Sequence, residues 1–461
     1  MQKIRFGTDG FRGIIAEDFT FSNVEIIGCA IADYLHKNKP KLAPANVIVG
    51  FDRRFLSDKF AQHISRALSK KGIDVVLTAK PVPTPAVSCF IRNNKSPLGI
   101  IVTASHNPAN FNGIKIKNEF GASATETVTR QIEKLIVTTS LKQGRNHKIG
   151  KVQKAGIVGP YIRFLKRYLN FNLLKKSHFN IIVDLMYGAG AGIFEQILRN
   201  TKIKVTSIHA EHDPLFGGIN PEPIAENLTD LKNMVRKLKP DLGIALDGDA
   251  DRIGAMCPNG KYISSHQAIC LLLLHLIENR RYSGRVIKSI NTTTMVDRIT
   301  QYHKIPLEVV PVGFKNIAAK MIQGDVLLGG EESGGIGFKD YMPERDGVLA
   351  GLLLLELMAY KKMPMLEIIH DMEKRFGRFI YLRRDLKIQR GVQDKKIPQP
   401  GRILGKKVAK IETYDGTKFI LADNSWLLIR ASGTEPILRI YAESPTLKFT
   451  QKLIDFGCDL I

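Results

Sequence analysis

"NVIVGFDRRFLSDKFAQHISRALSKKGIDVVLTA", residues 46–79, decides the fold class of this chain. Its two ends, 46–52 and 73–79, are short apolar runs typical of buried strands. The segment between them, 59–72, places apolar residues at helical spacing and ends in a glycine. A strand, a helix and a second strand in this order indicate a βαβ unit with parallel strands. This stretch therefore predicts an α/β domain.

The same order of strand, helix and strand recurs twice further along the chain. A second block begins with "FNIIVDLMYG" at 179–188, and a third begins with "GRVIKSI" at 284–290. Three blocks of similar size indicate one α/β fold repeated in tandem, with substantially parallel sheets. The end of the chain differs, because 376–444 has mostly strand patterns and 446–461 has the pattern of a closing helix.

We therefore expect three tandem α/β/α domains with mixed, mostly parallel sheets, followed by a C-terminal α+β domain. A chain of 461 residues is too long for one core, which agrees with several domains. Candidate linkers lie near 141–158, which is polar and rich in glycine and lysine, and near 370–376. The expected domains are 1–145, 155–256, 257–370 and 376–461.

Composition and targeting signals indicate a cytoplasmic protein. The chain is 44% hydrophobic and 24% charged, as in ordinary globular proteins. Its first residues lack the apolar core of a signal peptide, and apolar runs such as 348–355 are too short to cross a bilayer. The five cysteines show no C-x-x-C spacing, which argues for a reducing compartment and against disulfides or a zinc site. We expect no membrane partner.

The net charge of +24, from 68 basic and 44 acidic residues, raises the question of nucleic-acid binding. The basic residues are dispersed along the whole chain, and neither zinc-finger spacing nor a basic tail accompanies them. A lysine-rich solvated surface that attracts small anions explains the charge more simply. We therefore expect no nucleic-acid partner.

Three acidic residues provide the strongest functional signal, in "LDGDADR" at 246–252. Asp247, Asp249 and Asp251 alternate between two apolar strands, so an extended loop brings their carboxylates to one place. Three like charges are costly to hold together without a cation, and oxygen ligands without His or Cys suit Mg²⁺ or a similar ion. An EF-hand is excluded by Arg252, where that loop needs glycine. The alternative is a solvated acidic turn.

"TASHNP" at 103–108 follows an apolar strand pattern and offers a serine and a histidine. Pro108 biases the stretch away from helix, so it predicts an exposed turn. Ser105 is then either a turn residue that bonds nearby backbone or a nucleophilic or phosphorylated serine held in a fixed loop. The residues alone leave both readings open.

Two further loops carry groups suited to phosphates and sugars. "RASGTEP" at 430–436 combines an arginine, two hydroxyls and a glycine, which is a way to hold a phosphate, although a plain hairpin loop is equally consistent. "GGEESGG" at 329–335 offers carboxylate and hydroxyl groups to sugar hydroxyls, and is also consistent with a flexible acidic turn. Arg12, in the Gly-rich turn "FGTDGFRG" at 6–13, and Lys115, in "NGIKI", could each be a surface cation.

The order of these motifs resembles the phosphohexomutase family, which includes phosphoglucomutases, phosphomannomutases and phosphoglucosamine mutases. "FGTDGFRG", "TASHNP", "LDGDADR", "GEESGG" and "RASGTEP" match at fitting separations over essentially the whole chain. The resemblance implies four domains around one central cleft, each contributing one loop. It also implies an active-site phosphoserine, Mg²⁺, a phosphosugar substrate and a hexose 1,6-bisphosphate as intermediate and activator.

The resemblance implies a role for each matching residue. Phosphorylated Ser105 would complete the Mg²⁺ site with Asp247, Asp249 and Asp251, and Lys115 would transfer protons. The residues near the reacting phosphate would be Arg12, His106 and Arg252. The other substrate-binding residues would be Gly313 and Lys315 of "VGFK", Glu331 and Ser333 for sugar hydroxyls, and Arg430, Ser432, Gly433 and Thr434 for the remote phosphate.

The implied reaction is interconversion of hexose 1-phosphate and hexose 6-phosphate by a monomer or homodimer. Many bacterial members have His where this chain has Gly335. "VGFK" at 312–315 and "PERDG" at 343–347 resemble bacterial glucose and mannose enzymes, which favours glucose and/or mannose phosphates. The alternative within the class is phosphoglucosamine mutase. Outside it, the alternative is a catalytically silent sugar-phosphate or nucleic-acid-binding protein on the same fold.

Overall fold

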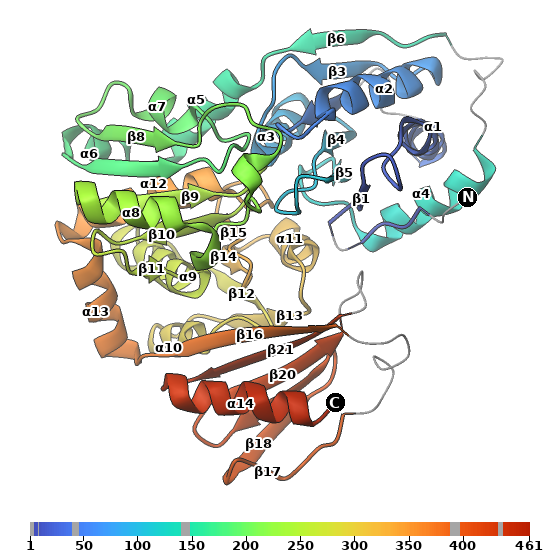
Figure 1. Ribbon diagram of the computed structural model, residues 1–461. Coiled ribbons are helices and arrows are strands. Elements are labelled where there is room, and N and C mark those ends of the chain that lie inside the picture. Colours follow the sequence, from blue (N-terminus) through green and yellow to red (C-terminus); the bar gives the residue numbers. More distant parts are fainter. Residues whose placement is uncertain (1–3, 8, 39–45, 140–147, 388–396, 432–436) are drawn as a thin grey trace.

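The computed structural model describes residues 4–7, 9–38, 46–139, 148–387, 397–431 and 437–461 (Figure 1). Three mixed sheets and one antiparallel sheet follow one another along the chain, in the order that the sequence predicts. The expected fold class is confirmed.

The first three sheets share one topology. In each, the first strand of the block lies in the middle: β2 (Val47–Phe51), β7 (Asn180–Asp184) and β12 (Arg285–Ser289). The second strand pairs parallel to it on one side: β3 (Val75–Thr78), β8 (Lys204–Ile208) and β13 (Leu307–Val310). The third pairs parallel on the other side: β4 (Leu98–Val102), β9 (Leu242–Leu246) and β14 (Val326–Gly330). The fourth returns antiparallel to the third: β5 (Phe111–Asn118), β10 (Ile253–Met256) and β15 (Ile336–Phe338).

Additional strands extend two of these sheets. β1 (Phe11–Ile14) pairs antiparallel with β5, and β11 (Tyr262–Ile263) pairs antiparallel with β10. β6 (Val152–Ala155) pairs parallel with β3 at the far edge of the first sheet. Its residues lie between the first two domains expected from the sequence, and those domain limits stay a prediction.

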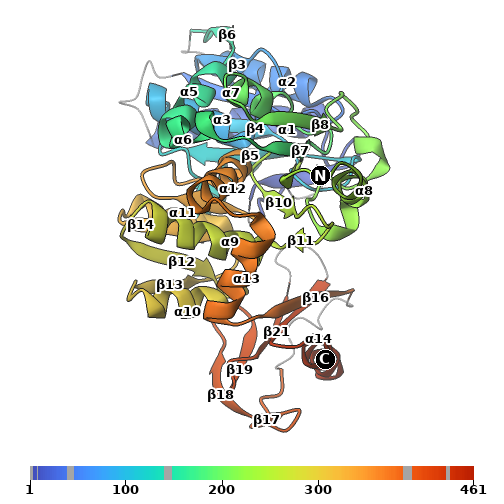
Figure 2. The ribbon, with the colours of Figure 1, turned by 90° about the vertical axis from the view of Figure 1, so that its left-hand side faces the viewer.

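Helices cover the sheets (Figures 1 and 2). Those of the first block are α1 (Phe21–Asn38), α2 (Ser57–Lys70), α3 (Thr84–Asn94) and α4 (Glu126–Thr138). Those of the second block are α5 (Val158–Tyr168), α6 (Phe171–Lys176), α7 (Ile193–Leu198), α8 (Thr229–Leu238) and the short turns Phe216–Gly218 and Ala225–Asn227. Those of the third block are α9 (Ser265–Leu274), its continuation His275–Asn279, α10 (Met295–Tyr302), α11 (Phe314–Ile322), α12 (Gly347–Lys361) and α13 (Met365–Phe376).

The apolar run at 348–355 forms part of α12, which is buried on all sides. Gly351 lets this helix approach the second domain, since a Cβ there would lie 2.9 Å from the ring of Phe194. One hydrophobic cluster contains residues of all three α/β domains, and the first domain also has a cluster of its own. Within the described ranges, no helix is both long and apolar enough to cross a membrane.

The fourth domain is an antiparallel sheet with strand order β16-β21-β20-β19-β18-β17. One helix, α14 (Leu447–Asp459), packs on it, with the hydroxyl of Thr446 accepting a hydrogen bond from the first turn. The strands are β16 (Ile380–Lys387), β17 (Arg402–Ile403), β18 (Lys406–Glu412), β19 (Thr417–Leu421), β20 (Trp426–Ala431) and β21 (Ile437–Ser444).

The repeated topology places three of the sequence motifs at equivalent positions. Each lies in the connection from the third strand of a block to its antiparallel fourth strand: 103–110 after β4, 247–252 after β9 and 331–335 after β14. These strands meet near the middle of the molecule in Figure 1. Ligand sites of α/β sheets form at such strand ends, so the tandem repeat itself brings the three loops together.

Candidate active site

A cavity of about 570 Å³ lies where the four domains meet. Its lining includes Arg12 and His106 from the first domain, Arg252 from the second, Glu331 from the third and Arg383 from the fourth. Motifs that are hundreds of residues apart therefore face one space.

Ser105 precedes His106 of the cavity lining and is itself fully buried, with a left-handed backbone φ of 53°. Its Oγ donates a hydrogen bond of 2.7 Å to Asp247 Oδ2 in the second domain. The carbonyl of Ser105 packs so closely on Gly248 that a Cβ there would lie 2.5 Å from it. The prediction of an exposed turn is therefore wrong for Ser105, because a loop from another domain covers it.

Arg54 binds the backbone of the Ser105 loop. Nothing in the sequence indicated this role. Its guanidinium donates to four carbonyl oxygens of the loop: Ser105 at 2.7 Å, Asn107 at 2.6 Å, Pro108 at 2.8 Å and Phe111 at 3.1 Å. Burial lowers the pKa of Arg54 to about 10 although Asp52, 3.3 Å away, favours the charged form. Four bonds to one planar donor set the shape of the loop.

The three aspartates of the second domain are fully buried, and their carboxylate oxygens lie within 4.8 Å of one another. The prediction that they meet at one place is confirmed, and the solvated acidic turn is excluded. The backbone N–H groups of Asp251 and Arg252 donate to Asp247 Oδ1 at 2.9 and 3.0 Å. Burial, and then the charges of Asp251 and Asp249, raise the pKa of Asp247 well above its usual range.

The carboxylate oxygens fit a bound cation. Among the described residues, neither Asp249 Oδ1 nor Asp251 Oδ1 has a hydrogen-bond partner, although both atoms are buried. Buried oxygens of this kind are costly unless a ligand satisfies them. Together with Asp247 and the hydroxyl of Ser105 they form a donor set of oxygen atoms only, which is the preference of Mg²⁺.

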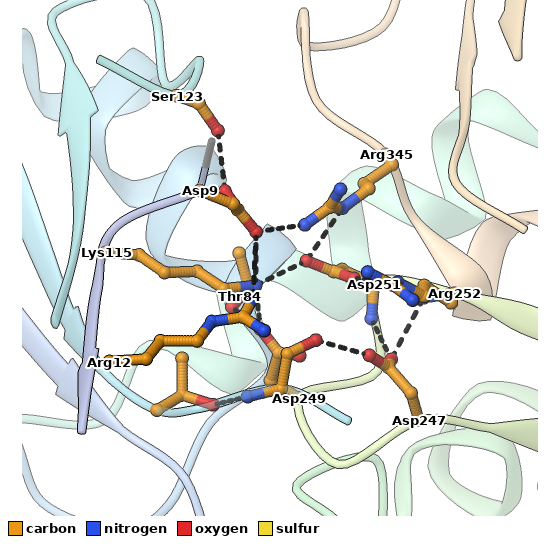
Figure 3. Close-up of polar contacts among 12 residues, drawn as sticks. Asp9, Arg12, Thr84, Lys115, Ser123, Asp247, Asp249, Asp251, Arg252 and Arg345 are labelled. Atoms are coloured by element: carbon orange, nitrogen blue, oxygen red, sulfur yellow. Dashed lines mark hydrogen bonds and ion pairs between the residues drawn. The ribbon is translucent and has the colours of Figure 1, made fainter. Parts of the chain in front are cut away.

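Lys115 is buried among these carboxylates, so the reading as a surface cation is wrong. Its Nζ lies 2.7 Å from Asp249 Oδ2, 2.8 Å from Asp251 Oδ2 and 3.1 Å from Asp9 Oδ2 (Figure 3). Burial lowers the pKa of Lys115, but the three carboxylates outweigh it and raise the pKa above its ordinary value. The hydroxyl of Thr84 also donates to Asp249.

Arg345 enters the same group from another side (Figure 3). Its Nε lies 2.9 Å from Asp251 Oδ2, its Nη1 lies 2.9 Å from Glu331 Oε1, and its Nη2 contacts Asp9. Burial raises the pKa of Asp9, but Arg345 and then Lys115 hold it well below its usual range. The sequence did not predict Arg345 or Asp9 as site residues. They are 336 residues apart, and no local pattern relates two such distant positions.

The predicted residues around the reacting phosphate all line the cavity. Arg12 lies on strand β1, not in a turn as expected, because residues 11–14 pair with β5; its Nη1 donates to Asn107 Oδ1 at 2.5 Å. Burial, and then the positive charges of Arg252 and Arg12, hold the pKa of His106 well below its usual range. This shift favours the neutral form of the imidazole.

The predicted sugar loop also faces the cavity. Ser333 Oγ donates to Glu331 Oε1 at 2.7 Å, and Glu331 is buried. Gly313 precedes α11 with a φ of 117°, which favours glycine. Lys315 follows it and lies 3.5 Å from Glu126 Oε2.

Of the expected remote-phosphate residues, the structure describes only Arg430. Arg430 is absent from the cavity lining, and its Nε donates to Asp415 Oδ1 at 2.8 Å. Ser432, Gly433 and Thr434 lie outside the described residues. The fourth domain instead contributes Arg383, Arg439 and Tyr441 to the lining, none of which the sequence analysis singled out.

Comparison with known proteins gives one family. Four domain models match: phosphoglucomutase/phosphomannomutase α/β/α domain I at residues 3–143, domain II at 159–260, domain III at 264–376 and the C-terminal domain at 388–456. They occur in the same order as the four sheets.

Relatives match over nearly their whole length. A Thermococcus kodakarensis protein named phosphoglucomutase/phosphomannomutase is 31% identical over 459 residues, covering 99% of this chain and 98% of the relative. A phosphoglucosamine/phosphogalactosamine mutase of Sulfurisphaera tokodaii is 28% identical, covering 98% and 97%. A crystal structure from Thermus thermophilus, described provisionally as a phosphomannomutase, superposes with a TM-score of 0.88 at 34% identity and covers 99% of each chain. The chain belongs to the phosphoglucomutase/phosphomannomutase family.

Proposed function

We propose that this chain is a phosphohexose mutase that interconverts the 1-phosphate and 6-phosphate of glucose and/or mannose through a phosphoserine at Ser105. The observation that carries the proposal is the 2.7 Å hydrogen bond between Ser105 Oγ and Asp247 Oδ2. It supports a serine whose phosphate would sit beside a cation-binding group of carboxylates. A catalytically silent binding protein would have no need of this arrangement.

Mg²⁺ fits the oxygen atoms of Ser105, Asp247, Asp249 and Asp251. When bound there it would neutralise charge on the phosphoryl group and lower the barrier to its transfer. The two unpartnered carboxylate oxygens of Asp249 and Asp251 support this assignment.

The proposed transfer moves one phosphoryl group in each half-reaction. The bond between phosphorus and Ser105 Oγ breaks while a bond forms to the free hydroxyl of a hexose monophosphate. The hydroxyl proton leaves to a basic side chain, for which His106 with its lowered pKa is the candidate. Ser105 Oγ takes up a proton as the phosphoryl group departs, and Lys115, whose raised pKa keeps it charged, is the candidate donor. The resulting hexose 1,6-bisphosphate turns end over end, and its other phosphate returns to Ser105. Arg12 and Arg252 supply positive charge around the transferring group.

The remaining predicted residues would bind the substrate. Glu331 and Ser333 face the cavity and offer a carboxylate and a hydroxyl to the sugar, with Gly313 and Lys315 beside them. The phosphate remote from Ser105 would be held by Arg430 and the loop of Ser432, Gly433 and Thr434. The arginines of the fourth domain that line the cavity are Arg383 and Arg439. Arg430 donates to Asp415 and lies outside the cavity lining, so it would have to leave Asp415 to bind that phosphate. Closure of the fourth domain would supply that change.

The names of the relatives bear on the preferred sugar. The relative at 31% identity carries the names of a glucose and a mannose enzyme, which supports those sugars. Several others, including one from Methanobrevibacter smithii at 30% identity, are named as probable phosphoglucosamine mutases and support the second candidate. A Cβ at Gly335 would lie 2.7 Å from Arg345 Cδ, so a side chain at this position would displace Arg345.

Competition in one tube would decide the substrate. Phosphorus NMR follows the 1-phosphates of glucose, mannose and glucosamine together, with Mg²⁺ and a trace of glucose 1,6-bisphosphate, because competition compares kcat/KM directly. We expect the glucose or mannose signal to move to the 6-phosphate first, and no movement with Ser105→Ala. Movement of glucosamine alone would establish the second candidate, and no movement at all would refute a mutase.

Localisation and assembly stay predictions. All five cysteines are free thiols, and Cys29, Cys89, Cys257 and Cys270 are buried, which supports the proposal of a cytoplasmic protein. A monomer or homodimer remains the expected state.

A further inference from the structure

Lys117 and Glu344 form an ion pair between two domains, 227 residues apart in sequence, and both side chains are wholly buried. Lys117 lies on β5 of the first domain, and Glu344 lies in the 343–347 segment that leads into α12. Ser123 Oγ accepts from Lys117 Nζ at 3.2 Å, and Ser88 Oγ donates to Glu344 Oε2 at 3.4 Å. Neither charged residue lines the cavity.

Stability alone is a poor explanation for this pair. Removing two charges from water costs about as much as their attraction returns, so neutral residues of similar size often serve equally well. A buried ion pair does fix geometry, because each partner must meet the other in one orientation. The question is what this pair holds in place.

Each partner is directly connected to a cation of the active site. Lys117 and Lys115 are two residues apart on β5, so their side chains leave the strand on the same face. Glu344 Oε1 accepts a hydrogen bond of 3.1 Å from the backbone N–H of Arg345. Lys115 and Arg345 both contact Asp251 Oδ2, at 2.8 and 2.9 Å.

We propose that Lys117 and Glu344 are positioning residues, which dock β5 against the 343–347 segment and thereby set Lys115 and Arg345 at their places on Asp251. Neither residue touches the substrate in this proposal. The expected change in kcat rests on the proposed mutase function. The expected change in the 247–252 loop does not depend on that function.

The double variant Lys117→Met/Glu344→Gln separates positioning from stability. Met replaces the lysine stem, and Gln keeps an oxygen acceptor for the Arg345 N–H, so neither charge is left unpaired. The single variants would each leave one buried group without its partner and would lower the melting temperature. The double variant should recover most of that loss while the tie between the two domains remains broken.

The chain offers a matched control in Arg280 and Glu356, which also form a buried ion pair, with two hydrogen bonds of 2.7 Å. Neither residue lines the cavity. Arg280→Met/Glu356→Gln likewise replaces a buried cation and its carboxylate partner with neutral side chains.

The measurements are kcat, KM, the melting temperature and amide hydrogen exchange of the 247–252 loop. For Lys117→Met/Glu344→Gln we expect a 10- to 100-fold lower kcat, as an order of magnitude, with KM changed less than about twofold and faster exchange in that loop. The control pair should keep the kcat and the loop exchange of the wild type.

Wild-type kcat and loop exchange in Lys117→Met/Glu344→Gln would overturn the proposal, as would equal losses in the control. An inactive wild-type protein would refute the proposed function. The positioning role would then be judged by loop exchange alone, and unchanged exchange would refute it as well.

Discussion

Arg54 Nη2 donates a hydrogen bond of 2.7 Å to the carbonyl oxygen of Ser105, and both residues are buried. The serine therefore depends on two buried contacts that its own motif does not contain: Arg54 on its carbonyl and Asp247 on its hydroxyl. The first fixes the loop, and the second fixes the side chain against the neighbouring domain.

Arg54→Lys should lower kcat/KM by roughly 10- to 100-fold, because a misplaced nucleophile costs about that much. Lysine keeps the charge but cannot donate to the four carbonyls that the guanidinium reaches. Arg53→Lys is the matched control, since Arg53 donates to the carbonyls of Ala210 and Glu211 instead. Steady-state kinetics of both variants test this, and equal losses would argue against a specific role for Arg54.

Ser105→Ala should abolish phosphorylation of the protein and reduce mutase activity to background, with the fold retained. The hydroxyl is the only group of Ser105 that the change removes, and its bond to Asp247 contributes about 1 kcal/mol. Mass spectrometry after incubation with glucose 1,6-bisphosphate should place one phosphate on the peptide that contains Ser105. Asp249→Ala should lose activity as well, and full activity in either variant would refute the assignment.

Mg²⁺ should raise the melting temperature of the wild type, because a cation between three buried carboxylates relieves their repulsion. At a Mg²⁺ concentration 100 times its Kd the gain would be about 2.7 kcal/mol. A chelator should reverse this gain and remove the activity, and added Mg²⁺ should restore both.

Asp249→Asn is the variant for this test, since it removes one of the three charges without changing side-chain size. It should abolish most of the thermal shift by Mg²⁺. The same shift in wild type and variant would place the cation elsewhere, and potassium chloride at equal ionic strength controls for screening.

The fold was predictable from local patterns because each strand and helix carries its own period, as residues 46–79 illustrate. The aspartate group was predictable for the same reason, since its three carboxylates alternate within one loop. We expected Ser105 to be exposed, because Asn107 and Pro108 indicate a turn but not what packs against it. Its burial comes from Gly248, which belongs to another domain.

Other site residues carry no local signal. Arg345 and Asp9 lie in different segments, and only the tertiary structure brings their charges together. The Lys117–Glu344 pair is of the same kind, because an isolated lysine on a strand usually faces solvent. In this protein the sequence predicts the aspartate group, whose residues are contiguous, but not the groups whose side chains come from distant segments.

The last prediction concerns pH and the interface between the third and fourth domains. Lys418 on β19 is buried, its Nζ donates to the carbonyl of Ile290 at 2.5 Å, and it lies 4.3 Å from the Trp426 ring centroid. Burial, and then the charge of Lys288, lower the pKa of Lys418 to about 7, although Asp297, Glu412 and Glu443 oppose the shift.

The direction of the pH effect follows from this depressed pKa. Between pH 7 and the ordinary lysine pKa of 10.5, the unfolded chain binds a proton that the folded protein does not. The contribution of Lys418 to the free energy of unfolding therefore increases as pH rises through this window, by at most about 1.4 kcal/mol per pH unit. It is lost as pH falls towards 7.

Lys418→Met removes this dependence, so the variant should gain stability relative to the wild type at pH 7 and lose that advantage towards pH 10. Urea unfolding at pH 7, 8 and 9 measures the difference, and Lys410→Met on the exposed part of β18 is the control. Parallel stability curves for wild type and Lys418→Met would mean that the ammonium stays charged in the folded protein.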